Sequence, residues 1–376
     1  MNKRNLIVTL SLLLAVSIGF LIACNPIAQQ SNNSQSNPQK ALTKVRFGVS
    51  PFQDTLVPIV GGEKGWYKEE GLDVEFSVLG WTEVMEALSA GSVDVAINNI
   101  SSVVATHQQN PNIIYYYGLN PFDNGFALMI RSDGKLKTLP QMMQQYPDRE
   151  TAIKMTAAQL KGKTVVTTGK TDMEQGVAAA ARKGGLDFKK DIKIIDLNPD
   201  EGLAAFLRGE GDAYIGGIPQ RTKASKEGMI EMLTGADLGP PPINGLVTTK
   251  QYAEAHQEEL LKILRVWFKT VKYINSNMDD GASVIIKKMN ASSGGNFTIE
   301  DFKKFWNNYE SYPASPKEVQ QMILDPKGKN YWQARFNDCN TYFYEITGTI
   351  KQPVKAEDAF WMEKAQRAYT EKYGLE

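Results

Sequence analysis

The chain has 376 residues, with 42 Lys and Arg against 42 Asp and Glu, and a net charge of zero at neutral pH. Because proteins that bind nucleic acids usually present a basic field, this balance argues against a nucleic-acid partner. Two cysteines and two histidines leave little material for metal sites, disulfide frameworks or histidine-based catalysis. We therefore expect a binding protein rather than a hydrolase, without metal or cofactor.

The first 23 residues have the layout of an export signal. Lys3 and Arg4 precede a long apolar run that contains no acidic residue. The run ends in Leu21-Ile22-Ala23-Cys24, which resembles the bacterial lipobox, in which the cysteine is acylated and becomes the new N-terminus. An uncleaved anchor helix is the alternative, since the run is close to the ~18 residues that span a membrane. Either interpretation places the rest of the chain outside the cytoplasm, attached to a membrane.

A polar, nearly uncharged stretch follows at 24–43 and is rich in Asn, Gln and Ser. Such a composition predicts a flexible tether with a reach of roughly 25 Å. If Cys24 carries lipid, it cannot pair with Cys339, the only other cysteine. We therefore expect Cys339 to be a buried and unreactive thiol.

Strands then alternate with helices in two similar blocks of sequence. Each predicted helix is followed by glycine, as expected at a C-terminus that needs a positive φ angle, and Ala87–Asp94 of the first block aligns with Ala205–Asp212 of the second. The repeated order of strands and helices predicts a duplicated α/β fold with two mostly parallel sheets flanked by helices. The predicted strands are 45–49, 72–79 and 94–97, then 163–168, 192–195 and 212–215; the predicted helices are 54–70 and 82–90, then 172–184 and 199–208.

The two blocks predict two lobes and a helical C-terminal tail. Apolar residues at helical spacing from Leu260 to Val271, and further helices near 298–309, 315–323 and 356–372, indicate a tail that packs back on the first lobe. The predicted division assigns 44–131 and 245–376 to lobe I, 160–242 to lobe II, and 132–159 to a connector or insertion.

A cleft between the lobes is the predicted site, because ligands of open parallel sheets bind beyond the carboxyl ends of the strands. Phe52 and Trp81 could form apolar walls, while Asp54 and Asp172 could contact a ligand or only cap helices. Arg221 could pair with an anion or simply begin a basic helix. The candidate ligand-binding residues are Ser50, Phe52, Gln53, Asp54, Trp81, Asn98, Asn99 and Ser101 in the first block, and Thr168, Gly169, Thr171, Asp172, Gln220 and Arg221 in the second.

Motifs of nucleotide and acyl-transfer chemistry do not occur in the sequence. Gly162-Lys163-Thr164 resembles the end of a P-loop, but position 157, where the motif needs glycine, is Ala157. There is no G-x-S-x-G nucleophile elbow and no G-x-G-x-x-G that opens a helix. These absences leave binding as the favoured activity.

The segment Gly65-Trp66-Tyr67-Lys68-Glu69-Glu70-Gly71-Leu72-Asp73-Val74 resembles the G-x-[FY]-x-x-x-G-[LI]-x-[VI] signature of the nitrate-, sulfonate- and taurine-binding and thiamine-pyrimidine-related solute-binding proteins. Ala87–Ala96 and Leu160–Val165 match further segments of that family, and the likeness spans about 44–275. The resemblance implies a two-lobed periplasmic binding protein fold (type II) that feeds an ABC importer. The 132–159 connector is longer than the family pattern, so it could reshape the rim of the cleft.

The leading hypothesis is thus a monomeric, lipid-anchored, extracytoplasmic binding protein that delivers a small solute to an ABC permease. Predicted helix N-termini and Arg221 favour an anion of the sulfonate, taurine or nitrate type. Phe52, Trp81 and the run Tyr115-Tyr116-Tyr117 favour a pyrimidine or another flat heterocycle instead, unless the tyrosines are strand and core. Two other functions stay open: a thiamine-pyrimidine synthase-like enzyme, although this chain lacks the cysteine-rich segment of that branch, and a ligand sensor.

Overall fold

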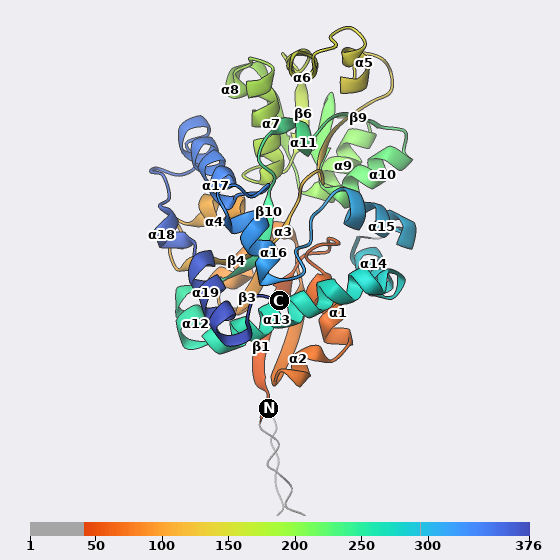
Figure 1. The fold of residues 1–376 in the computed structure, drawn as a ribbon. Helices are drawn as coiled ribbons and strands as arrows, with labels where there is room; N and C mark the ends of the chain where they lie inside the picture. Colours follow the sequence, from red (N-terminus) through yellow and green to blue (C-terminus); the bar gives the residue numbers. More distant parts are fainter. Residues whose placement is uncertain (1–40, 294) are drawn as a thin grey trace, which may run out of the picture. The chain divides into compact units, whose positions relative to one another are not determined.

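Two five-stranded sheets organise the part of the chain that the computed structural model describes, residues 41–293 and 295–376 (Figure 1). The predicted signal segment 1–23, the lipidation site Cys24 and most of the tether lie outside the described residues and stay predictions. Among the helices of the described part, none combines the length and the apolar character that crossing a membrane requires.

The first sheet has the strand order β2-β1-β3-β10-β4. β1 pairs in parallel with β2 and β3, whereas β10 enters antiparallel between β3 and β4. Alternating side chains of β1, including Val45, Phe47 and Val49, are fully buried, which is why this segment forms a strand beneath covering helices. The strands are β1 (Thr43–Val49), β2 (Leu72–Val78), β3 (Val95–Asn99), β4 (Ile113–Pro121) and β10 (Ile243–Thr249).

The second sheet repeats this arrangement with the order β7-β6-β8-β5-β9. β6 pairs in parallel with β7 and β8, and β5 enters antiparallel between β8 and β9. The equivalent strand orders agree with the duplicated, mostly parallel α/β fold that the sequence predicts. The strands are β5 (Ala127–Ile130), β6 (Thr164–Thr167), β7 (Lys193–Asp196), β8 (Ala213–Gly216) and β9 (Ile230–Thr234).

The position of strand β5 differs from the division into lobes that the sequence suggested. The predicted lobe I, 44–131, includes β5, but β5 belongs to the second sheet. An apolar tetrapeptide does not reveal which sheet it joins, because that choice depends on the crossover of the chain after Pro121. We propose that lobe II comprises residues 126–238. Lobe I then comprises the described residues of 41–121 and of 243–376.

Helices cover both sheets and end where the glycines predict. Gly71, Gly91, Gly185 and Gly209 all have positive φ angles. The first predicted helix is split at Gly65, which also has a positive φ angle of 77°. Lobe I carries α1 (Val57–Glu63), α2 (Trp66–Glu69), α3 (Trp81–Ser89) and α4 (Ile100–Thr106); lobe II carries α7 (Asp172–Lys183), α8 (Phe188–Asp191), α9 (Pro199–Leu207), α10 (Ile218–Lys226) and α11 (Gly235–Leu238).

The connector forms two helices, α5 (Leu139–Met143) and α6 (Arg149–Ala158). α6 packs against α7 and β9 of lobe II. Figure 1 shows both connector helices beyond the lobe II sheet, at the end farthest from β1.

The C-terminal tail is helical, as predicted, and packs mainly on lobe I. α13 contacts α1, α17 contacts α4, and α19 contacts β4. The run Tyr115-Tyr116-Tyr117 lies buried within β4, so its tyrosines belong to strand and core. The tail comprises α12 (Lys250–Ala255), α13 (Gln257–Ser276), α14 (Met278–Ser293), α15 (Ile299–Asn308), α16 (Pro316–Val319), a π-helix (Gln320–Leu324), α17 (Trp332–Asn340), a second π-helix (Thr341–Ile346), α18 (Ala356–Ala359) and α19 (Met362–Tyr373).

The tail also bridges the two lobes. Arg335 of α17 donates a 2.9 Å hydrogen bond to Ser101 of lobe I and a 2.8 Å hydrogen bond to Gln175 of lobe II. Tyr342 donates a 2.6 Å hydrogen bond to Glu174 on the same helix of lobe II. These contacts hold the two lobes against each other beside the pocket described next.

Candidate functional site

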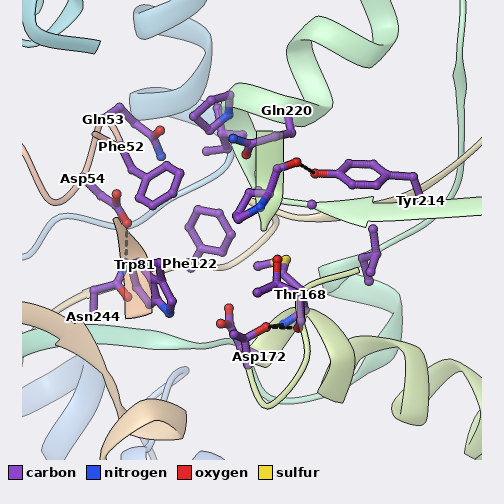
Figure 2. A pocket seen from close by; sticks show the side chains of 18 residues that line it. Phe52, Gln53, Asp54, Trp81, Phe122, Thr168, Asp172, Tyr214, Gln220 and Asn244 are labelled. Carbon is purple, nitrogen blue, oxygen red and sulfur yellow. Dashed lines mark hydrogen bonds between the residues drawn. The ribbon is translucent and has the colours of Figure 1, made fainter. Parts of the chain in front are cut away.

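A pocket lies between the carboxyl ends of the strands of the two lobes, as predicted for this architecture (Figure 2). Together with the solvent at its mouth, it holds about 590 Å³ of space free of protein atoms, within the range of small-molecule sites. It is lined by Phe52, Gln53, Asp54, Trp81, Phe122, Thr168, Thr171, Asp172, Met173, Pro199, Tyr214, Ile215, Gly216, Gly217, Ile218, Pro219, Gln220 and Asn244.

Two aromatic side chains form the lobe I wall of the pocket. Phe52 lies in the loop after β1 and Trp81 is the first residue of α3, and their rings meet edge to face with centroids 5.7 Å apart. Asn98 at the end of β3 donates a 3.3 Å hydrogen bond to the carbonyl oxygen of Trp81. The predicted apolar walls are therefore present, and Asn98 positions one of them from outside the pocket.

Asp54 presents a buried carboxylate to the pocket. The side chain is 3% exposed, accepts a hydrogen bond from Asn244 on β10, and accepts one of 2.8 Å from the N–H of Thr55. Burial raises the pKa of Asp54 to about 6, and the nearby charge of Asp172 acts in the same direction. The residue before α1 is Leu56, so Asp54 is not the helix cap that the sequence allowed.

Asp172 presents a second buried carboxylate from lobe II. It is the first residue of α7, while Thr171 is the N-cap and accepts a 3.2 Å hydrogen bond from Met173 N–H. Burial raises the pKa of Asp172, and the positive charge of Arg335 opposes that rise. The helix is thus capped by a hydroxyl and not by this carboxylate, and the side chain of Asn99 lies beside the carboxylate.

Two buried amides offer oxygen atoms to the pocket. The Gln53 amide nitrogen donates a 2.8 Å hydrogen bond to Glu310, and the Gln220 amide nitrogen donates one of 3.1 Å to Asp200. Because these carboxylates accept the N–H groups, the amide oxygens of Gln53 and Gln220 point elsewhere, and neither oxygen has a hydrogen-bond partner among the described residues. Both amides are at most 2% exposed.

The charge of the pocket comes from acids. Among the described residues that line it, Asp54 and Asp172 are acidic and none is Lys, Arg or His. A second cavity shares Phe52 and Trp81 with the first and adds acidic residues. We call this second cavity the vestibule; its charged lining residues, within the described chain, are Glu83, Asp200 and Glu201.

Arg221, expected either to pair with an anion or to begin a basic helix, does not line the pocket, and its helix α10 begins at Ile218. Its guanidinium is buried, donates a 2.7 Å hydrogen bond to Glu231 of β9, and also donates to the carbonyl oxygen of Asn124. The same group lies 4.3 Å from the ring centroid of Tyr309. Since these partners occupy the guanidinium, the argument that Arg221 favours an anion no longer applies.

Eight of the 14 predicted ligand-binding residues line the pocket, and six do not. Ser101 instead hydrogen bonds Arg335, the side chain of Asn99 caps α4 by accepting from Ser102 N–H, and Gly169 N–H donates to Asp196. The six residues outside the lining are Ser50, Asn98, Asn99, Ser101, Gly169 and Arg221.

Lining residues outside the predicted set come from three places. Phe122 and Asn244 lie where the chain crosses between the sheets, the run from Tyr214 to Pro219 joins the end of β8 to α10, and Met173 and Pro199 lie at the starts of α7 and α9. The order of strands in the second block gave a signal for the β8 loop, whereas nothing in the sequence marked Phe122. No residue of the 132–159 connector lines either cavity, so the expected reshaping of the rim is not found in the described chain.

The described part of the chain contains no group of three or more His, Cys, Asp or Glu side chains that could hold a metal ion. Cys339 is buried and burial raises the pKa of its thiol, as expected for an unreactive cysteine.

Two sheets of equivalent strand order with a pocket between them correspond to the two-lobed fold of periplasmic binding proteins. The structure is similar to the periplasmic aliphatic sulphonate binding protein SsuA from Escherichia coli, with a TM-score of 0.65 and 15% identity over 86% of this chain and 93% of that one. It is also similar to the periplasmic nitrate-binding protein NrtA from Synechocystis PCC 6803, with a TM-score of 0.62 and 14% identity over 88% and 89% of the two chains. At these identities the likeness establishes the fold.

The chain belongs to the NMT1-like family, whose model matches residues 38–287. A Bacillus subtilis (strain 168) protein named as an aliphatic sulfonates-binding protein is 26% identical over 284 residues, 73% of this chain and 76% of the relative. Another protein of that strain, named as the binding protein YtlA, is 24% identical over 306 residues, 77% of this chain and 85% of the relative. Family and fold agree with the resemblance that the sequence motifs indicate.

Proposed function

We propose that this protein is the extracytoplasmic solute-binding component of an ABC importer, attached to the membrane through lipid on Cys24. It acts by binding a small solute and presenting it to a permease, without catalysis. Support comes from the NMT1-like family match and from relatives that are named as binding proteins.

The observation that carries the proposal is the composition of the pocket wall. Phe52, Asp54 and Trp81 come from lobe I, while Asp172 and Gln220 come from lobe II. A solute held in this way contacts both lobes at once, so it stabilises the arrangement in which they face each other. Such a hinge closure converts occupancy of the pocket into a change of shape that a permease can recognise.

The chain has the connections that a hinge requires. The backbone crosses between the sheets after β4 at Pro121 and again before β10 at Ile243, and the Phe122 N–H donates a 2.8 Å hydrogen bond to the Pro242 carbonyl oxygen, which joins the two crossings. Paired crossings allow the lobes to rotate about a common line without breaking either sheet. Contacts of Arg335 with Ser101 and Gln175 would have to part as the lobes separate.

The names of the relatives support a sulfonate- or nitrate-like solute, as the sequence analysis favoured. The local chemistry does not add to that support, because Arg221 is engaged by Glu231 and the described lining residues carry no cationic side chain. The class of solute therefore needs an argument from the pocket itself, which is developed in the next subsection.

Equilibrium dialysis tests the proposed function without assuming a ligand. The full-length chain in mild detergent is dialysed against a metabolite extract, and retained compounds are identified by mass spectrometry. We expect the wild type to retain one solute. Trp81→Ala and Gln220→Ala should both lose it, because these two residues line the pocket from opposite lobes. Gln145→Ala, an exposed position on the connector, is the matched control.

Retention of no solute, or retention that both pocket variants leave unchanged, would contradict solute binding at this site. For the transport step, a strain that lacks the chain should lose uptake of the retained compound. Normal uptake in that strain would contradict the role in an importer.

A further inference from the structure

We propose that the solute is an organic cation that carries N–H groups, an ammonium or amidinium on a small apolar or aromatic body. The inference rests on the proposed function and specifies the ligand of the same pocket. It follows from the hydrogen-bonding groups, the charges and the rings that the pocket presents.

The pocket offers acceptors rather than donors. The unpartnered amide oxygens of Gln53 and Gln220 are buried and belong to lining residues, as do the carboxylates of Asp54 and Asp172. A buried acceptor without a partner costs free energy, so a ligand that supplies N–H groups at these positions gains affinity. An anion such as a sulfonate brings further acceptors and would leave these oxygens unpaired.

Hydroxyl groups of the lining do not reverse this balance. Thr168 donates its hydroxyl hydrogen to the carbonyl oxygen of Leu197, and Thr171 donates to that of Thr168. Among the described residues, the indole N–H of Trp81 is a donor without a partner. Against it stand the unpartnered amide oxygens of Gln53 and Gln220 and the two buried carboxylates, so a ligand that mainly donates hydrogen bonds fits this lining better than one that mainly accepts them.

The charges of the groups around the pocket also favour a cationic ligand. The carboxylates of Asp54 and Asp172 are close enough for the charge of one to raise the pKa of the other, and the buried Glu310 lies near Asp54 as well. Arg335 offsets part of the charge of Asp172 from behind the pocket, but it also faces Asp338 at 3.5 Å. Two carboxylates brought together in a site of low dielectric are stabilised by a positive group placed between them.

Aromatic rings complete a site for a cation. Phe52, Trp81, Phe122 and Tyr214 all contribute to the lining. Figure 2 shows the rings of Phe52 and Phe122 in the middle of the view, with Asp54 to one side and Asp172 below. Ring faces attract cations and also accommodate an apolar body, so this combination of rings and carboxylates fits an amphipathic cation.

The vestibule, which shares lining residues with the pocket, carries charge of the same sign. Glu83, Asp200 and Glu201 are its charged lining residues in the described chain. Lys223 pairs with Asp200 at 3.5 Å, which reduces but does not reverse the negative charge of this cavity. Negative charge beside the pocket raises the local concentration of cations and lowers that of anions.

Four probes of similar body and different head group test the inference on the full-length chain by isothermal titration calorimetry. They are benzamidine, a cation with N–H groups; benzamide, which is neutral; benzenesulfonate, an anion; and phenyltrimethylammonium, a cation without N–H groups. We expect benzamidine to bind at least about tenfold more tightly than benzamide and phenyltrimethylammonium, and benzenesulfonate to show no binding.

Variants locate the effect at the two carboxylates. Asp54→Asn and Asp172→Asn remove one charge each with little change of shape, and both should reduce the preference for benzamidine over benzamide. Asp73→Asn, an exposed position on β2 away from the pocket, is the matched control and should leave the preference unchanged. Circular dichroism of each variant checks that the fold is retained.

Three outcomes would overturn the cationic assignment: tighter binding of benzenesulfonate, equal binding of benzamidine and benzamide, or no binding of benzamidine at millimolar concentration. Binding of phenyltrimethylammonium as tight as that of benzamidine would overturn the requirement for N–H groups. Each of these results leaves the dialysis experiment to judge solute binding, so failure of the ligand class and failure of the proposed function are distinguishable.

Discussion

The loops that follow β1 and β6, strands at equivalent positions in the two sheets, reach equivalent acids. Asp54 comes five residues after the end of β1, and Asp172 comes five residues after the end of β6. Both loops reach the pocket from the carboxyl end of their strand. The duplicated fold therefore places one carboxylate from each lobe in the same pocket.

The surroundings of these two carboxylates differ. Asp54 accepts a hydrogen bond from Asn244 of the crossover strand β10 and lies near Glu310, which burial and the charge of Asp54 favour in its neutral form. Burial raises the pKa of Asp172, and the positive charge of Arg335 of the C-terminal tail opposes that rise. The duplication thus determines where the two acids lie. Segments outside the repeat determine how much uncompensated charge each acid carries.

Replacing Asp54 and Asp172 separately should show most clearly that the two equivalent positions differ in their effect on binding. We expect Asp54→Asn to weaken benzamidine binding about 100-fold and Asp172→Asn about tenfold, because Arg335 already compensates part of the second charge. Calorimetric titration of both variants measures the ratio. Equal losses would show that Arg335 does not distinguish the two acids.

Replacing Arg221 tests whether its guanidinium stabilises the fold or binds the ligand. Arg221→Ala removes the ion pair of the buried guanidinium with the partly exposed Glu231 and the contact with Tyr309, and we expect it to destabilise the protein by about 2 kcal/mol. Benzamidine affinity should change less than about twofold, within the usual scatter of remote substitutions. Urea unfolding and calorimetry give the two values, with the exposed Arg208→Ala as control.

A variant with unchanged stability and no affinity for the solute retained in dialysis would contradict the structural assignment of Arg221. It would return this residue to the role of ligand that the sequence first suggested.

The pH dependence of binding sharpens the comparison further. Because burial raises the pKa of Asp54 to about 6, its carboxylate is charged at neutral pH and protonated in mild acid. The groups that face it are the amides of Asn120 and Asn244, the Thr55 N–H, and the acids Asp172 and Glu310. We expect benzamidine affinity to fall about tenfold between about pH 7.5 and about pH 5. Asp54→Asn should flatten this profile, and a wild-type profile that is already flat would show that Asp54 is not the titrating group.

The smallest effect concerns the stability of the free protein. A carboxylate whose pKa is raised in the folded state destabilises that state above its folded pKa, and the penalty disappears as the pH falls from about 6 towards the unfolded value of 3.8. Asp54→Asn should therefore stabilise the ligand-free protein by about 1 kcal/mol at neutral pH and by little near pH 4. Urea titrations at the two pH values measure the gain; a destabilised variant at neutral pH would contradict this sign.

Local patterns were sufficient to predict much of the fold and part of the site. Apolar alternation and the glycines at helix ends predicted both blocks, and the rule for parallel sheets then led to Asp54, Trp81 and Asp172. Asn244 could not be found in this way, because its place beside Asp54 depends on β10 crossing into the first sheet.

The role of Arg221 could not be decided from the sequence for the same physical reason. Its partner Glu231 lies on β9, and only the pairing of β9 with β5 in lobe II sets where that carboxylate lies. The sequence shows that Arg221 is charged and close to a helix, but tertiary contacts decide whether a buried guanidinium is already paired.

Cys339 provides a natural chemical probe of the opening of the two lobes. Its sulfur lies 3.3 Å from the hydroxyl of Ser101 on α4 and 3.6 Å from the amide oxygen of Gln175 on α7, where the two lobes and α17 meet. A thiol reagent can reach the sulfur only after these elements part. If Cys24 is acylated, the labelling rate of this one remaining thiol measures how often the molecule opens, and a solute that slows labelling does so by lengthening the time the lobes stay closed.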